Sequence, residues 1–168
     1  MQNCKSKFKI VRNKNIGIFD SGFGGLDVMR GIVKILPEYD YIYLADSARV
    51  PYGTRSKEEI YKFTEQAVDF LAKRNCELII LACNTVSSEA LRKIQDEYIP
   101  KKYKNKKVLG VLVPAIEASI ETSENKKIGV MATSATVKSK AFFKKIKKIN
   151  SKISIYQSAC PALVLLIE

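Results

Sequence analysis

The chain of 168 residues contains no histidine and no long apolar run. Protein zinc sites are built mainly from cysteine and histidine, and the four cysteines of this chain show no Cys-x-x-Cys spacing. We therefore expect no metal site. No stretch approaches the roughly 18–20 apolar residues that span a membrane, so we expect no membrane partner.

Predicted strands and helices alternate along the whole sequence. The strands are expected at 16–19, 41–45, 77–82, 107–113, 127–132 and 152–157, and the helices at 25–36, 57–74, 86–98, 115–123, 136–149 and from about 161. Ser56 and Glu59 predict a capping box at the start of the second helix. The alternation predicts an α/β fold with a parallel sheet and right-handed crossovers.

The pattern also predicts how the chain is divided. Residues 1–14 are basic and are not followed by the apolar segment of a secretion signal, so we expect a disordered tail there. The charged segment 100–107 lacks an apolar pattern and is the predicted internal boundary. We expect residues 15–99 to form a first α/β domain and residues 100–168 to comprise a linker and part of a second, incomplete α/β domain.

Polar residues directly follow three of the predicted strands. Asp20 and Ser21 follow the first strand, the segment 51–55 (PYGTR) follows the second after a short loop, and residues 83–85 (CNT) follow the third. The carboxyl ends of parallel strands lie at one edge of the sheet, where α/β proteins place their ligand sites. We therefore expect these three groups to converge on one ligand.

Cys83 is the candidate reactive thiol. It lies at a strand-to-helix turn, where amide donors and a helix N-terminus favour the thiolate, so we expect its pKa to be lower than those of Cys4 and Cys76. A buried cysteine is often only a small core residue, but the polar residues after Cys83 favour a site. Cys76, at the other end of the strand, and Cys160 are interpreted as structural. In a cytoplasmic α/β protein all four cysteines are expected to be thiols.

Five sequence motifs occur in an order that resembles the N-terminal portion of the glutamate racemases, within the aspartate/glutamate racemase superfamily. They are FDSGFGGL (19–26), PYGTRS (51–56), ACNT (82–85), GVMATSAT (129–136) and CPALVLLIE (160–168). The resemblance implies a flavodoxin-like parallel sheet flanked by helices. It also implies a cytoplasmic isomerase that interconverts L- and D-glutamate without a cofactor, for peptidoglycan synthesis, cell wall biogenesis and cell shape. Members of the family commonly form homodimers.

The resemblance also implies roles for individual residues. A racemase removes the Cα proton and returns it on the opposite face, which requires two bases. Cys83 would be one of two cysteine bases, serving the D-enantiomer, and Asp20 would assist proton movement; capping of the following helix is the alternative role for Asp20. The implied substrate-binding residues are Asp20, Ser21, Pro51, Tyr52, Gly53, Asn84, Thr85, Thr133, Thr136 and Glu168.

One departure from the family affects the expected activity. The second catalytic cysteine of the family belongs to a Gly-Cys-Thr-His motif that follows the segment matched by 160–168, and the 168 residues do not contain it. We therefore expect the chain to be inactive alone and to need a C-terminal segment for a complete site.

Two other functions are left open by the sequence. Gly22-x-Gly24 after a strand, with Asp46 at the end of the next strand, resembles a dinucleotide-binding fingerprint, but Asp27 occupies the third glycine position and would crowd the approach of the helix.

Clustered lysines suggest the second alternative, a basic protein that contacts nucleic acid. Residues 5–14, 101–107 and 138–152 hold most of the lysines and arginines of a chain with a net charge of +12. In 138–152, however, an apolar helical stripe leaves the lysines facing outward; its residues are Phe142, Phe143, Ile146 and Ile149. We favour a solvated surface helix and expect no nucleic-acid partner.

Overall fold

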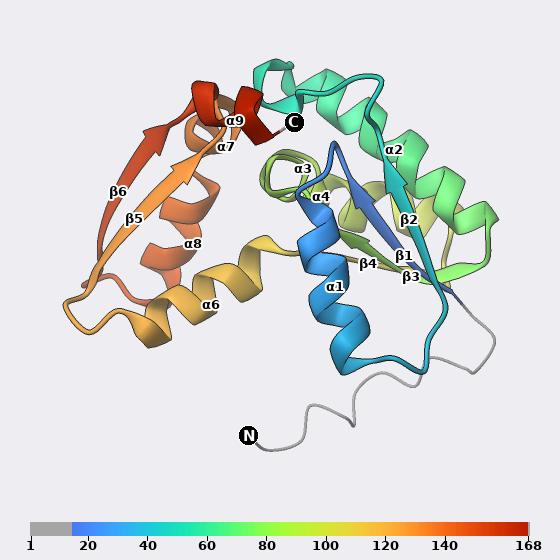
Figure 1. Ribbon diagram of the computed structural model, residues 1–168, viewed down its shortest axis with the longest axis horizontal. Helices are drawn as coiled ribbons and strands as arrows, with labels where there is room; N and C mark the ends of the chain where they lie inside the picture. The colour runs from blue at the N-terminus through green and yellow to red at the C-terminus, as the bar shows by residue number, and fades with distance from the viewer. Residues whose placement is uncertain (1–14, 168) are drawn as a thin grey trace.

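The computed structural model describes residues 15–167, which form two parallel sheets joined by helices (Figure 1). The predicted tail at 1–14, with Cys4, and the substrate-binding candidate Glu168 lie outside the described residues. The first sheet has the strand order β2-β1-β3-β4, and the second pairs β5 with β6. The strands are β1 (Asn15–Asp20), β2 (Tyr41–Ala45), β3 (Cys76–Leu81), β4 (Lys107–Gly110), β5 (Lys127–Ala132) and β6 (Ser154–Ala159).

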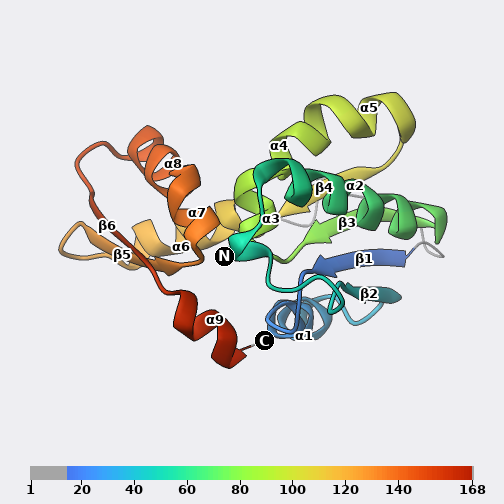
Figure 2. The same cartoon turned by 90° about the horizontal axis from the view of Figure 1, so that it is seen from above.

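Helices cover both faces of the first sheet (Figure 2). One face carries α1 (Gly25–Ile35), and the other carries α2 (Lys57–Lys73) with the segments that follow β3. The remaining elements are η1 (Tyr52–Thr54), α3 (Asn84–Glu89), α4 (Leu91–Lys93), η2 (Ile94–Tyr98), α5 (Ile99–Lys102), α6 (Leu112–Thr122), α7 (Ser134–Ser139), α8 (Ala141–Ile149) and α9 (Pro161–Ile167). The strand order β2-β1-β3-β4 matches the first four strands of the flavodoxin-like order 2-1-3-4-5. The predicted α/β class is therefore confirmed.

The first sheet is held by apolar side chains on both faces of its central strand. Ile16 and Ile18 of β1 pack toward α1, whereas Phe19 packs toward α2, as expected from the alternation of side chains along a strand. The predicted capping box is present at the start of α2: Ser56 Oγ accepts from Glu59 N at 3.2 Å, and Ser56 N donates to Glu59 Oε2 at 2.9 Å. Cys76 is fully buried in this core, in agreement with its structural interpretation.

The predicted helix at 86–98 differs from the structure. The chain forms α3 and α4, continues through the π-helical segment η2, and ends as α5 at Lys102. Pro100 lacks a backbone N–H, and its ring would clash with the carbonyl four residues earlier in a regular helix. The wider turn of η2 directly before it accommodates the proline without ending the helical path.

The predicted boundary at 100–107 does not separate the two sheets. β4 pairs in parallel with β3, from Leu78 with Lys107 to Leu81 with Gly110, and therefore belongs to the first sheet. The segment has no apolar pattern because β4 is an edge strand in which only Val108 is buried, and many of the residues around it are lysines. The division between the sheets comes after Gly110, where α6 leads to β5 (Figure 1).

The second sheet is covered by helices on one face. Leu112 and Ile116 of α6 and Ile146 of α8 pack against Ile128 and other apolar residues there. The single helix predicted at 136–149 is divided into α7 and α8 by Lys140, whose φ of 56° is left-handed. On the sheet's other face, Met131 and Tyr156 are 70% and 62% exposed, and the last residues of α9 are exposed as well. None of the helices within residues 15–167 is both long and apolar enough to cross a membrane.

Candidate active site

The polar groups that follow β1, β2 and β3 converge on one cavity of about 220 Å³, as the sequence predicted. Its wall is completed by small or apolar residues that were not predicted as site residues, among them Val28 of α1 and Val164 of α9. The predicted site residues that line it are Asp20, Ser21, Pro51, Tyr52, Gly53, Cys83, Asn84, Thr85 and Thr133.

Cys83 lies between the end of β3 and the start of α3, with only 6% of its surface exposed. Its sulfur is 3.3 Å from the Ser21 hydroxyl oxygen, which comes from the end of β1. Burial, and to a smaller extent the nearby Asp20 carboxylate, raise the pKa of Cys83 to about 11. Hydrogen bonds from Ser21 and from the backbone of Val86 act in the opposite direction but are outweighed. In this unliganded site the donors that were expected to favour the thiolate are present, but desolvation dominates. Burial also raises the pKa of Cys76, so the expected order of the cysteine pKa values stays a prediction.

Asp20 is anchored beside this thiol by the start of α1. Its Oδ2 accepts a hydrogen bond from Gly25 N at 2.8 Å, and the side chain is buried. Gly25 permits this approach because a Cβ there would lie 2.6 Å from Asp20 Cβ and 2.9 Å from Tyr43 Oη. Asp20 thus satisfies a free N–H of the helix, as expected of a capping residue, and also places a carboxylate next to Cys83. Its part in proton movement stays a prediction.

Tyr52 lines the cavity, but its hydroxyl is directed elsewhere. The side chain is 1% exposed, and the hydroxyl donates a hydrogen bond to Asp46 Oδ2. Burial and this carboxylate hold the pKa of Tyr52 far above its usual value. Tyr52 is one of the predicted substrate-binding residues, but the one proton of its hydroxyl is donated to Asp46. The sequence did not predict this contact, because Asp46 was considered only as part of a dinucleotide-binding fingerprint.

Three threonine hydroxyls connect the two sheets at the edge of the cavity. Thr85 comes from α3, whereas Thr133 and Thr136 come from the start of α7. The Oγ1 atoms of Thr85 and Thr133 are 2.9 Å apart, those of Thr133 and Thr136 are 3.0 Å apart, and those of Thr136 and Thr85 are 3.4 Å apart. Gly53 packs against this group, since a Cβ there would lie 2.6 Å from Thr133 Cβ.

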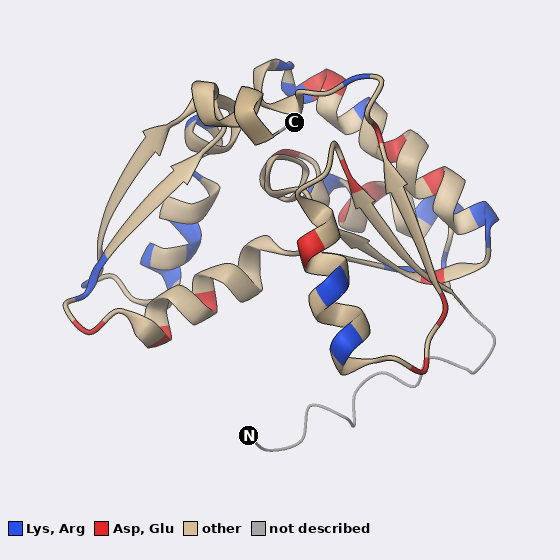
Figure 3. Ribbon diagram, in the orientation of Figure 1, with Lys and Arg blue, Asp and Glu red and all other residues tan. Residues whose placement is uncertain are grey.

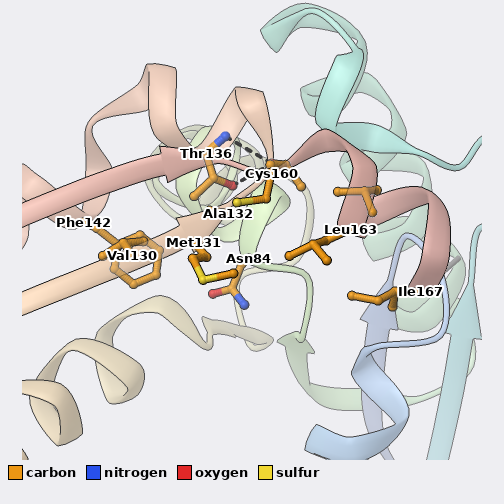
Figure 4. A pocket seen from close by; sticks show the side chains of 11 residues that line it. Asn84, Val130, Met131, Ala132, Thr136, Phe142, Cys160, Leu163 and Ile167 are labelled. Atoms are coloured by element: carbon orange, nitrogen blue, oxygen red, sulfur yellow. Dashed lines mark hydrogen bonds between the residues drawn. The ribbon is translucent and has the colours of Figure 1, made fainter.

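A second cavity of about 270 Å³ adjoins the first (Figure 4). Asn84 and Thr133 line both cavities, and Thr136 lines only the second. Cys160, which we interpreted as structural, lines the second cavity with its thiol 3.7 Å from the carbonyl oxygen of Ser158. The remaining wall is largely apolar and includes Met131 of the second sheet.

The structure also bears on the two alternative functions. Asp27, expected to crowd the approach of α1 to the sheet, instead points outward and pairs with Arg30 at 2.9 Å, and Gly25 occupies the close contact. In α8, Ile146 of the predicted apolar stripe is fully buried, but Phe143 and Ile149 are 41% and 46% exposed and share the outer surface of the helix with lysines (Figure 3). Both observations agree with ordinary helix packing.

Comparison with known proteins identifies the family. Residues 16–165 match the family described as Asp/Glu/Hydantoin racemase. The chain is 43% identical over 157 residues to glutamate racemase 1 of Caldanaerobacter subterraneus subsp. tengcongensis, in an alignment that covers 94% of this chain and 56% of that protein. The chain therefore belongs to the aspartate/glutamate racemase family, and it spans little more than half the length of the curated relatives it matches.

Solved structures of relatives share the fold. A glutamate racemase isoform from Bacillus anthracis superimposes with a TM-score of 0.85 at 31% identity, over 94% of this chain and 57% of that one. The glutamate racemase of Francisella tularensis subsp. tularensis, solved in complex with D-glutamate, gives a TM-score of 0.82 at 38% identity, over the same shares of the two chains.

Proposed function

We propose that this chain forms one part of a cofactor-independent glutamate racemase and that the cavity beside Cys83 binds glutamate. The observation that carries the proposal is the meeting of Asp20, Ser21 and Cys83, from two neighbouring strands, at one buried site. Membership of the racemase family supports it, as does the relative that was solved in complex with D-glutamate. In the cell, the enzyme would act in the cytoplasm and supply D-glutamate for peptidoglycan, as a homodimer and without a nucleic-acid partner.

The proposed reaction requires the Cys83 thiolate. The thiolate takes the Cα proton of D-glutamate, and a second acid returns a proton to the opposite face of the carbanion. In the unliganded site burial keeps Cys83 protonated. The ammonium group of a bound amino acid adds a positive charge beside Cys83 and Asp20, and such a charge lowers the pKa of a thiol. Ser21, already at 3.3 Å, can donate a hydrogen bond to the thiolate once it forms.

The substrate carboxylates need hydrogen-bond donors, which the rest of the wall supplies. The side-chain amide of Asn84 lies at the junction of the two cavities. The hydroxyls of Thr85, Thr133 and Thr136 bond one another in the unliganded site. Each hydroxyl has one proton, so a carboxylate that accepts from a threonine replaces one of these internal bonds. The proposed binding residues therefore include all four, and Glu168 remains a candidate from the family resemblance.

We propose that the second base is a cysteine from a segment equivalent to the part of the relatives that the alignment with this chain does not cover. Of the other described cysteines, Cys76 is buried at the opposite end of β3, and Cys160 lines the neighbouring cavity. The 168-residue chain alone is then expected to leave glutamate unracemised.

The test follows the circular dichroism of D-glutamate and, in parallel, deuterium incorporation at Cα by proton NMR. Adding the C-terminal segment of the racemase, in the same chain or separately, should restore turnover, and Cys83→Ala should abolish it. Turnover by the 168 residues alone would contradict the two-cysteine proposal. In that case Cys160→Ser would show whether the thiol of the second cavity is the other base.

A further inference from the structure

Asp46 lies outside the cavity but joins two segments that form it. The residue directly follows β2, and its backbone N–H donates to the carbonyl oxygen of Asp20 at 3.1 Å. Its side chain is only 10% exposed. One carboxylate oxygen, Oδ2, accepts a hydrogen bond from the hydroxyl of Tyr52 and forms an ion pair with Arg49, whose Nε lies 2.6 Å away. The carboxylate therefore connects the start of the segment between β2 and η1 with Arg49 and Tyr52 further along it.

Both partners of this carboxylate are themselves fixed to α2. The Arg49 guanidinium lies 4.2 Å from the centre of the Phe63 ring, and its Nη1 donates to Gln66 Oε1 at 2.6 Å. The Tyr52 ring packs between Phe63, at 5.5 Å between ring centres, and Phe19 of β1, at 6.3 Å. Since packing holds both partners in place, the hydrogen bond from Tyr52 and the ion pair with Arg49 hold Asp46 and its loop in one position.

The loop fixed in this way forms one wall of the candidate active site. Pro51, Tyr52 and Gly53 line the same cavity as Cys83, and Gly53 packs so closely on Thr133 that it leaves no room for a Cβ. A small displacement of the loop would therefore change both the cavity and its contact with the second sheet. Asp46 itself does not line the cavity.

We propose that Asp46 is a positioning residue of this site, which acts through the Tyr52 hydroxyl to hold the Pro51–Gly53 wall against Cys83. In this arrangement Tyr52 contributes to the site through the placement of its backbone and ring rather than through its hydroxyl. The proposal rests on the proposed function only for the identity of the ligand, because the contacts of Asp46 with Tyr52 and Arg49 exist in the unliganded protein.

The test compares Asp46→Asn and Tyr52→Phe, which preserve side-chain size, with a matched control. The control is Asp69→Asn: Asp69 on α2 also accepts from a tyrosine hydroxyl, that of Tyr103, and pairs with lysines, but it does not line the cavity. The rate of Cys83 alkylation by iodoacetamide is measured by peptide mass spectrometry, first without ligand. Loosening the wall should expose the thiol, so Tyr52→Phe should raise the rate about tenfold, the factor expected for loss of one hydrogen bond to a charged group. Asp46→Asn should raise the rate by a smaller factor, because the amide oxygen can still accept from the Tyr52 hydroxyl.

A double variant separates positioning from general loss of stability. Asp46→Asn removes the charge from the contact that Tyr52→Phe removes altogether. Their combination should therefore add little to Tyr52→Phe alone, whereas independent destabilisation would multiply the two rates. Asp69→Asn should leave the Cys83 rate unchanged. Circular dichroism confirms that each variant is folded, and if Asp46→Asn fails to fold, Tyr52→Phe carries the test.

The second half of the experiment adds D-glutamate. The ligand should protect Cys83 in the wild-type chain, and a higher concentration should be needed for half-protection in Asp46→Asn. If D-glutamate fails to protect the wild-type chain, the proposed ligand is wrong. The alkylation rates without ligand then still test whether Asp46 positions the loop. Unchanged unliganded rates in both variants, or multiplied rates in the double variant, would overturn the positioning role.

Discussion

The charge of Asp20 should control how readily Cys83 reacts in the unliganded chain. A thiol with a pKa of about 11 holds roughly a hundredfold less thiolate at pH 8 than one at 9.0, since each pKa unit is a factor of ten. Asp20→Asn removes the neighbouring negative charge but can keep the hydrogen bond from Gly25 N, because an amide oxygen is also an acceptor. The variant should therefore have a lower pKa at Cys83 and a faster alkylation at pH 8.

The size of the increase is bounded by the structure. Burial is the largest cause of the raised pKa of Cys83, and Asp20→Asn leaves that burial in place, so the increase should stay below the hundredfold limit. The assay is the rate of iodoacetamide alkylation between pH 6 and 11, resolved for each cysteine by peptide mass spectrometry. Asp27→Asn is the matched control, since Asp27 is exposed on the outer side of α1 and should leave the profile unchanged.

Two outcomes would refute this account of the site. A wild-type profile with its midpoint at or below pH 9 would show that burial does not dominate at Cys83. An Asp20→Asn variant that reacts at the wild-type rate would show that the carboxylate does not act on the thiol electrostatically.

Three further predictions test the same geometry. The pKa of Cys83 is about 11 in the folded chain against an ordinary value of 9.0, so the free energy of unfolding should fall between about pH 9 and 11, by at most about 3 kcal/mol. Urea titrations at pH 8.5 and 10.5 measure this decrease, which should be smaller in Cys83→Ala. Ser21→Ala should raise the pKa of Cys83 further in the alkylation profile, because it removes the hydrogen bond at 3.3 Å. Gly53→Ala should lower Tm by several degrees through its overlap with Thr133, whereas Gly129→Ala, with no atom within 4 Å of the added Cβ, should lower it far less.

The sequence predicted much of the site because the relevant signals are local. A buried strand followed by polar residues places them at the carboxyl edge of a parallel sheet, so Asp20, Ser21 and Cys83 could be grouped from the order of residues alone. The capping box of Ser56 and Glu59 was predictable for the same reason, since both partners lie within one helical turn.

Pairing between distant segments was not accessible in this way. The lysines near β4 gave no sign that Val108 would be buried beside β3, because an edge strand needs few apolar residues to join a sheet. Likewise, Asp46 could be recognised as a partner of Tyr52 only when the loop was seen folded over α2.

By itself, then, the sequence determined the strand–helix alternation and which side chains stand at the edge of the sheet, because both depend on short-range periodicity. Only the tertiary structure decided the chemistry of those side chains. The pKa of Cys83 is the balance between local donors, which the sequence placed correctly, and burial in a core that also contains Phe19, Tyr52 and Val86. Desolvation depends on every atom that packs around the thiol, so no local pattern could give its size, and here it outweighs the donors.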